Sequence, residues 1–514
     1  MRTWFVFMFV LIAAFGRSAV GQTPGKKVVI HHGLNDSHSK SWIQENRDGD
    51  LGISYFQRFD SSYSDGTLLY KTISPNGPVH IDTVTTGARL EKSVLLYDSL
   101  FRPHIFVARS DATDQVIDHY SRTETGEWQS ETIIHFYNEG GKFIYELSAE
   151  SGPDDSFHLL VLKTRYDVDS WGFLSAWIDA NLYHLTNASG VWEKDLVSRH
   201  DMAYTYDMYI KSSCRQDMKV DKNGFVHVTF SEQINDTDDP SRLLYATNRT
   251  GTWQIETALN YDEGSRDDAG WFPSLCLDTG GTPYISCMYV DRVYTHSAAD
   301  CKLLLLKRLG SDNWSSEVIA TQDDGYYGRD GRNFTGGLIH LVIDRDNTPH
   351  IIFSDIAANH WSGIQRLNVG NIRYAVCENG VWDIRTVYRQ PQPTGFYSAT
   401  EMYGLCLNVS DQTDLKRVVG VELVVAGENQ YTCSLLDFEW AGSCCTGTTG
   451  NVNLMNGVDL ADLSALISYM VGGSYILPCR SEADINADEA IDISDLSTLV
   501  SYLSGNGYVL PVCP

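Results

Sequence analysis

Most of this 514-residue chain is an internal repeat of about sixty residues, and the repeat restricts the folds open to it. The clearest copy has one apolar run ending at Asp221, a second starting at Val226, a third through Leu244-Tyr245 and a fourth after Trp253. The Asp-x-Asn-Gly turn between the first two runs predicts a β-hairpin. Each copy therefore predicts four short strands. The tryptophans that follow the third strand lie 61 to 68 residues apart: Trp128, Trp192, Trp253, Trp314 and Trp382.

Five clear copies and two weaker flanking copies fill residues 22–440. Radial repetition of four-stranded units predicts an all-β fold, a seven-bladed β-propeller. The last copy stops after its third strand, while residues 26–31 form an isolated apolar run. We expect this N-terminal strand to complete the last blade, which removes a free sheet edge. A side-by-side solenoid is the structural alternative.

The repeat is similar in architecture to the sialidase-like (BNR) propellers, whose blades end in a Gly-containing turn and a Trp. The Asp-box of that class needs Ser-x-Asp-x-Gly-x-Thr-Trp. Here Gly251 and Trp253 are one residue too close, and Asn248 and Arg249 stand in place of the acid. The resemblance therefore covers the architecture and not the box, and it assigns no catalytic residue.

Four histidines occupy corresponding places in different copies: His104, His158, His227 and His350. Neighbouring sheets pack about 10 Å apart, whereas metal ligands must each come within about 2 Å of one ion. These histidines therefore cannot share a metal, and we predict that they are structural. The repeated tryptophans are likewise predicted to be packing residues.

The segments that enter each innermost strand would surround one mouth of the ring, and they are rich in aromatic and charged residues. Aromatic faces with fixed polar groups suit a sugar ring. Carboxylates here would serve as acid and base in glycoside cleavage, or beside Arg and Tyr in lyase chemistry. The alternative is that these loops are simply solvated turns. The candidate ligand residues are Arg89, Tyr145, Glu146, Trp271, Arg332, Glu401 and Tyr403.

Within this rim, Trp271 is the predicted stacking platform, because Pro273 stiffens the chain beside it. Arg89 and Arg332 are predicted to meet an acidic sugar, since a planar guanidinium suits a carboxylate.

The C-terminal residues contain two loop–helix units 33 residues apart. Oxygen-bearing side chains at loop positions 1, 3, 5, 9 and 12 are typical of a calcium loop, as is a backbone carbonyl at position 7. The first loop has Met455 at position 5, which offers no oxygen, so its site should be the weaker. Acidic, solvated loops without metal are the alternative. The predicted calcium ligands are Asp484, Asn486, Asp488, Ala490, Asp492 and Asp495 in the second loop, and Asn451, Asn453, Gly457, Asp459 and Asp462 in the first.

Paired calcium loops without entering helices resemble a dockerin. The resemblance implies a cohesin-like scaffold protein as partner, with contacts at loop positions 10 and 11, here Leu460-Ala461 and Ile493-Ser494. The chain departs from the dockerin pattern at position 6, where Asn456 and Glu489 replace the usual Gly. The alternative is that these helices only pack on the propeller.

Residues 1–21 combine Arg2, an apolar run and small residues before Gln22, which predicts a secretory signal peptide. The expected domains are 1–21, 22–440 and 441–514. No other run is long and apolar enough to span a bilayer. A net charge of −27 disfavours nucleic acid and anionic membranes.

The 11 cysteines suit an oxidising compartment, and because their number is odd at least one thiol must be unpaired. Cys444 and Cys445 are expected to pair with Cys479 and Cys513, in an order that the sequence leaves open. Together these features predict a secreted, extracellular or surface-bound protein that binds or degrades a polysaccharide. If it is an enzyme, it is a glycoside hydrolase or polysaccharide lyase. The alternative is a non-catalytic extracellular recognition protein.

Overall fold

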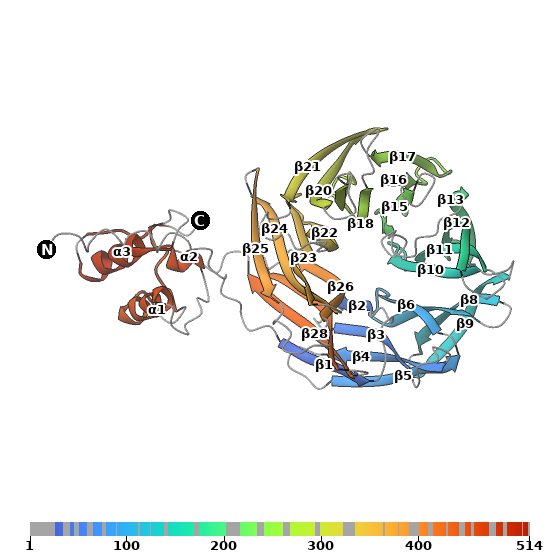
Figure 1. Cartoon of the computed structure of the whole chain (residues 1–514), viewed down its shortest axis with the longest axis horizontal. Coiled ribbons are helices and arrows are strands. Elements are labelled where there is room, and N and C mark those ends of the chain that lie inside the picture. The colour runs from blue at the N-terminus through green and yellow to red at the C-terminus, as the bar shows by residue number, and fades with distance from the viewer. Residues whose placement is uncertain are drawn as a thin grey trace.

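A computed structural model of the chain shows a ring of β-sheets with a small helical part beside it (Figure 1). The structure describes residues 26–33, 42–45, 51–58, 65–73, 79–88, 90–110, 114–123, 125–137, 142–168, 174–201, 216–233, 241–260, 268–292, 299–321, 335–362, 365–378, 380–389, 400–409, 415–427, 430–441, 448–453, 457–471, 480–486, 491–505 and 507–511. The predicted signal peptide lies outside these residues.

The strands form antiparallel units of four in chain order. The first three units are β2 (Trp42–Glu45), β3 (Leu51–Arg58), β4 (Asp65–Ile73) and β5 (Val79–Ala88); β6 (Leu90–Tyr97), β7 (Pro103–Ser110), β8 (Asp114–Arg122) and β9 (Trp128–Tyr137); and β10 (Lys142–Ser151), β11 (Phe157–Val168), β12 (Leu174–Thr186) and β13 (Glu193–Asp201).

The next units are β14 (Gln216–Val220), β15 (Val226–Gln233), β16 (Ser241–Thr247) and β17 (Gln254–Leu259); β18 (Asp268–Leu277), β19 (Pro283–Arg292), β20 (Ala299–Gly310) and β21 (Asn313–Thr321); and β22 (Thr335–Ile343), β23 (Pro349–Ser362), β24 (Gln365–Glu378) and β25 (Val381–Arg389). A single parallel bridge, from Ser241 to Asp268, links the β14–β17 unit to the β18–β21 unit. The four strands predicted around Asp221 are confirmed.

The last unit joins the two ends of the ring. It contains β26 (Thr400–Val409), β27 (Leu415–Gly427) and β28 (Gln430–Ala441), and β1 (Lys26–Gly33) pairs antiparallel with β28. The prediction that an N-terminal strand completes the last sheet is therefore confirmed. The first strands of successive units also contact one another in a cycle, from β2 through β6, β10, β14, β18, β22 and β26 back to β2. These first strands are the innermost strands of a closed β-propeller ring (Figure 1).

A carboxylate-centred turn joins the first two strands of several units. The Asp221 carboxylate accepts hydrogen bonds from the backbone N–H groups of Asn223 (2.8 Å) and Phe225 (3.0 Å). Gly224 supplies the left-handed conformation that such a turn requires, with φ of 81°. Asp98, Asp278 and Asp344 accept the corresponding pairs of bonds in their own units: Leu100 and Arg102, Gly280 and Thr282, and Asp346 and Thr348.

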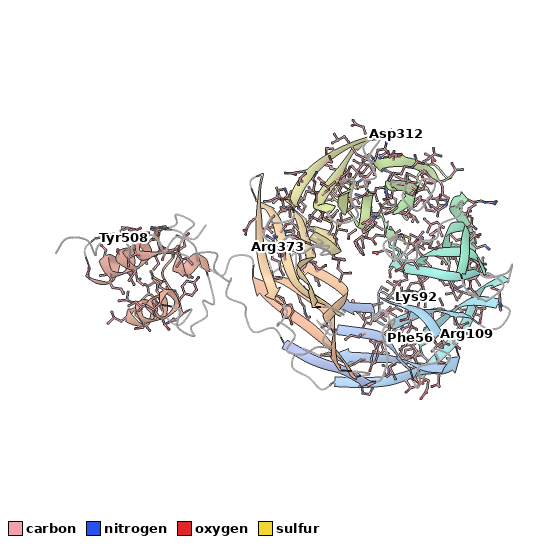
Figure 2. The ribbon with its side chains drawn as sticks, in the orientation of Figure 1. Phe56, Lys92, Arg109, Asp312, Arg373 and Tyr508 are labelled. Atoms are coloured by element: carbon pink, nitrogen blue, oxygen red, sulfur yellow. The ribbon has the colours of Figure 1, made fainter. Side chains whose placement is uncertain are left out.

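The repeated histidines are buried beneath these turns, so the prediction that they are structural is confirmed. His350 Nε2 lies 3.2 Å from Asp344 Oδ2, and its Nδ1 accepts from the Tyr374 hydroxyl at 2.6 Å. In the corresponding place His227 Nδ1 is hydrogen-bonded to the Tyr245 hydroxyl, while its Nε2 lies 3.6 Å from the Asp221 carboxylate, beyond hydrogen-bond distance. The repeated tryptophans pack against the hydrophobic clusters between sheets, as predicted. Figure 2 shows side chains in the spaces between sheets, including Phe56.

The helical part has its own core. It contains α1 (Leu460–Met470), α2 (Arg480–Ala483) and α3 (Ile493–Leu503). Val452, Leu466, Ile485 and Leu499 are buried together there, and every residue of this cluster comes from residues 452–510. None of the described helices is long and apolar enough to cross a membrane.

Candidate functional site

Polar side chains brace the innermost strands to one another around the axis of the ring. Asp217 on β14 accepts a hydrogen bond from Leu275 N on β18 at 2.7 Å. Ser274 on β18 accepts from Leu341 N on β22 at 3.0 Å. His340 on β22 accepts at Nδ1 from Leu407 N on β26 at 3.2 Å. Each bond joins a backbone N–H of one innermost strand to a side chain of the neighbouring innermost strand.

An ion pair also joins two of these innermost strands. Lys219 Nζ on β14 is 2.9 Å from Glu150 Oε2 on β10, so the pair joins two neighbouring units. The two side chains are 29% and 31% exposed, so solvent reaches them although they lie on innermost strands. Asp217, Cys276 and His340 interact electrostatically with Lys219. We call Glu150, Asp217, Lys219, Cys276 and His340 the axial cluster.

The surroundings fix the charges of most of the axial cluster. Burial opposes the charge on Lys219, but the Glu150 and Asp217 carboxylates outweigh it and raise the pKa of Lys219. Burial raises the pKa of Asp217, although Lys219 and two backbone N–H groups lower it. Burial lowers the pKa of His340 to about 3, and the charge of Lys219 adds to this effect. Near neutral pH the cluster therefore holds a charged lysine and a neutral histidine.

The hydrogen bonds indicate what these groups offer a ligand. Because His340 Nδ1 accepts from Leu407, a neutral imidazole must carry its proton on Nε2, which makes that atom a donor. Lys219 is held charged, so it acts as a donor and a positive charge rather than as a base. Glu150 supplies an acceptor next to Lys219. Donors and an acceptor on the innermost strands suit a polyhydroxylated ligand, and a carboxylate there can take or give a proton.

The sequence did not single out this cluster. The signal that could have identified it is the placement of Asp217 and Lys219 two residues apart in a strand otherwise expected to be interior, where an unpaired charge is costly. Glu150 and His340 are likewise polar residues inside innermost strands.

The predicted rim is described only in part. Glu146 is half-buried on β10, while Tyr145 on β10 and Glu401 and Tyr403 on β26 lie on described strands, with side chains outside the described residues. Arg89 and Arg332 lie outside the described residues altogether.

The prediction for Trp271 needs correction. Its indole is only 9% exposed and packs with Met288 and Cys301, against Phe272 and Ile339. A ring buried in this way presents no face to a sugar, so Trp271 is a packing residue. The prediction was wrong because Pro273 and the adjacent aromatic residues are also compatible with an irregular strand. Strand β18 has register shifts on both sides of Trp271.

That irregularity brings the backbone close to a neighbouring unit. Gly270 has φ of 88°, and a Cβ added there would lie 2.6 Å from Leu243 Cβ. Phe272 also has a positive φ, 51°, which is unusual for a bulky residue. Glycine at position 270 is therefore required by both conformation and space.

The two C-terminal loops share one hydrogen-bond pattern. Asp459 and Asp492 cap α1 and α3 and accept from Ala461 N (2.6 Å) and Ser494 N (2.7 Å). The position-12 carboxylates, Asp462 and Asp495, are fully buried within their loops.

Asp495 accepts three backbone hydrogen bonds, from Ile485 N (2.7 Å), Asn486 N (3.1 Å) and Asp492 N (2.9 Å). The loop thus wraps around this carboxylate.

The donor set of the second loop fits a divalent cation. Burial raises the pKa of Asp495 despite the three N–H groups, and the charge of Asp484 adds to the effect. A bound cation would relieve this accumulation of negative charge, and calcium prefers oxygen ligands. In the part of the chain that the structure describes, no three His, Cys, Asp or Glu side chains are grouped as metal ligands. Asp488 and Ala490 of this loop lie outside that part, as do the four tail cysteines.

Comparisons with known proteins give only distant likenesses. No protein-family profile and no curated protein matches the chain. The solved structure of the polysaccharide lyase Uly1 is 9% identical with a TM-score of 0.48, over 82% of this chain and 99% of that one. An α-L-arabinanase from Penicillium chrysogenum is 9% identical with a TM-score of 0.38, over 80% and 98% of the two chains. An α-L-arabinofuranosidase from Fusarium graminearum is 10% identical with a TM-score of 0.38, over 80% and 97%. At these values the likeness is too distant to assign a function to this chain.

Proposed function

We propose that residues 22–440 form a seven-bladed β-propeller that binds or degrades an extracellular polysaccharide. Residues 441–514 form a calcium-binding, dockerin-like domain that docks it to a cohesin-like scaffold protein or a cell surface. Residues 1–21 direct secretion.

The observation that carries the propeller's role is the axial cluster. Its ion pair between Glu150 and Lys219 keeps two charged groups within reach of solvent on the innermost strands of the ring. A sugar offers hydroxyls that need both donors and acceptors, and Lys219, His340 and Glu150 provide both.

Degradation and recognition are distinguished by whether a proton is moved. In a hydrolase or lyase, Glu150 would exchange a proton with the substrate while Lys219 and His340 hold it in place. In a recognition protein the same three residues would only bind. The neutral state of His340 serves either role, because its Nε2 remains a fixed donor.

The docking role is supported by the repetition of one arrangement in both loop–helix units. Asp484, Asn486, Asp488, Ala490, Asp492 and Asp495 would hold the calcium of the second loop, and the ion would neutralise the buried Asp495. Leu460 and Ile493 are exposed apolar residues at corresponding positions at the start of α1 and α3. Exposed apolar side chains at both places suit contact with a partner.

The test uses the full-length secreted protein with a panel of neutral and uronate-containing polysaccharides. Retention in affinity electrophoresis reports binding, and chromatography with ultraviolet absorbance reports hydrolysed or unsaturated products. Retention with products supports an enzyme, and retention without products supports recognition. Absence of both across the panel would overturn the polysaccharide proposal. Capture of a surface protein in calcium, and its loss with chelator, tests docking.

A further inference from the structure

The turn between β6 and β7, residues 98–102, differs from the corresponding turns of other units. The fourth residue of this turn has a positive φ in five units: Phe101 (60°), Asp155 (60°), Gly224 (81°), Gly281 (79°) and Asn347 (64°). Gly, Asn and Asp tolerate this left-handed conformation, whereas a bulky aromatic residue is strained in it. Phe101 is therefore the exception among these turns.

The same turn is exposed and apolar at its tip. Leu100 is 69% exposed and Phe101 is 37% exposed. In the β14–β15 and β22–β23 turns, the residues at these two places are Asn223-Gly224 and Asp346-Asn347. An apolar pair thus occupies a position that is polar or glycine in other units, without being buried by the fold.

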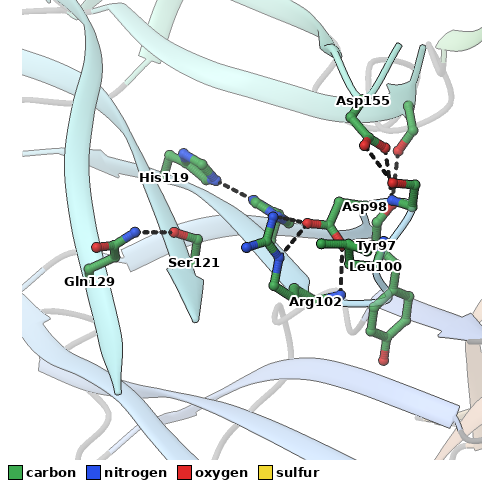
Figure 3. Close-up of polar contacts among 11 residues, drawn as sticks. Tyr97, Asp98, Leu100, Arg102, His119, Ser121, Gln129 and Asp155 are labelled. Carbon is green, nitrogen blue, oxygen red and sulfur yellow. Dashed lines mark hydrogen bonds and ion pairs between the residues drawn. The ribbon is translucent and has the colours of Figure 1, made fainter. Parts of the chain in front are cut away.

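Hydrogen bonds hold this tip in place. The Asp98 carboxylate accepts from Leu100 N (3.0 Å), Arg102 N (2.8 Å) and Arg102 Nε (2.7 Å). Ser99 donates from both N and Oγ to the Asp155 carboxylate, at 2.8 and 2.6 Å, which fastens the turn to the next unit (Figure 3). Strain that the surroundings enforce in this way is characteristic of functional positions.

We propose that Leu100 and Phe101 form a stacking platform for a sugar ring of the same polysaccharide that the axial cluster binds. This inference rests on the proposed function. Asp155, which accepts the hydrogen bonds from Ser99, lies in the turn of residues 152–156. This turn directly follows Ser151 at the end of β10, the strand that carries Glu150. A polymer held at the axial cluster would therefore extend across this face of the ring onto the platform.

The chemistry around the platform favours a polysaccharide over a lipid surface or a second copy of the chain. Asp154 and Asp155 are exposed beside it, and their charges repel anionic lipid. The surface of two apolar residues is far smaller than the roughly 800 Å² per partner that a stable protein interface buries. A sugar ring needs one apolar face with polar groups at its edge, which the carboxylates and the Arg102 guanidinium provide.

The test is Phe101→Asn, which places at the tip the residue that the β22–β23 turn uses. The melting temperature should stay the same or rise, because Asn tolerates the left-handed conformation. The dissociation constant for the polysaccharide retained by the wild type should rise roughly three- to tenfold, since a stacked ring is lost. The matched control, Val191→Asn, changes another exposed apolar residue and should leave binding unchanged.

The outcomes separate this inference from the proposed function. If wild type and Phe101→Asn bind the polysaccharide equally, the platform is overturned while the axial site stands. If the wild type binds no polysaccharide in the panel, both are overturned. If Val191→Asn weakens binding as much as Phe101→Asn, the effect is not specific to the platform and the inference fails.

Discussion

Lowering the pH from 7 to 5 should lower the free energy of unfolding of the ring, and His227 illustrates the contribution of one buried histidine. It is fully buried, and its Nδ1 is hydrogen-bonded to the Tyr245 hydroxyl. Burial lowers its pKa to about 4 although the Asp221 carboxylate opposes this, whereas the ordinary value is 6.5. Between these values the unfolded chain binds a proton that the folded chain does not. The free energy of unfolding therefore falls with the pH, by about 2 kcal/mol at pH 5 relative to pH 7 for this histidine.

Urea unfolding followed by tryptophan fluorescence at both pH values measures this loss. His227→Gln removes the titrating group, so its loss between pH 7 and pH 5 should be smaller than that of the wild type by about 2 kcal/mol. Tyr245→Phe is the matched control: it removes the same hydrogen bond but keeps the histidine, so the wild-type pH dependence should remain. If His227→Gln keeps the full dependence, His227 is not the buried neutral group that the structure indicates.

Two further sets of variants test strand β18 and the second calcium loop. Gly270→Ala should lower stability by about 2–3 kcal/mol in thermal or urea unfolding, because its Cβ would meet Leu243 as well as strain the backbone; Gly224→Ala, with no atom within 4 Å, should cost only about 1 kcal/mol. Equal losses would contradict the close approach. Calcium at a hundredfold excess over its dissociation constant should stabilise the C-terminal domain by about 2.7 kcal/mol. Calorimetry should show this shift lost in Asp495→Asn with the propeller transition unchanged, and a single transition indifferent to chelator would refute it.

Much of the fold could be predicted from the repeat, because its turns depend only on residues that are close in the sequence. Asp221 and Gly224 occupy the hairpin turn that their spacing predicts, and each needs only its neighbours to adopt it. Pairing of β1 with β28 was also predictable, since the last repeat lacked a fourth strand. The structural role of His227 and His350 followed from their repetition in separate sheets.

The site was less predictable because it depends on contacts between units. Glu150 and Lys219 are 69 residues apart, and nothing local indicates that they pair across two innermost strands. Trp271 was predicted to face a ligand, but the bulged β18 turns it into the core. Phe101 could have been noticed by aligning the turns, but its strain and exposure became evident only in the structure.

The most direct test of the account is the dissociation constant of the polysaccharide for Glu150→Gln, measured by isothermal titration calorimetry. This change keeps the side-chain volume and removes the charge that faces Lys219. Glu193→Gln, on the outer strand β13, is the matched control. The axial site predicts that Glu150→Gln weakens binding about tenfold or more, the cost of losing a charged hydrogen-bond partner, while Glu193→Gln binds like the wild type. Equal dissociation constants for the two variants would contradict it.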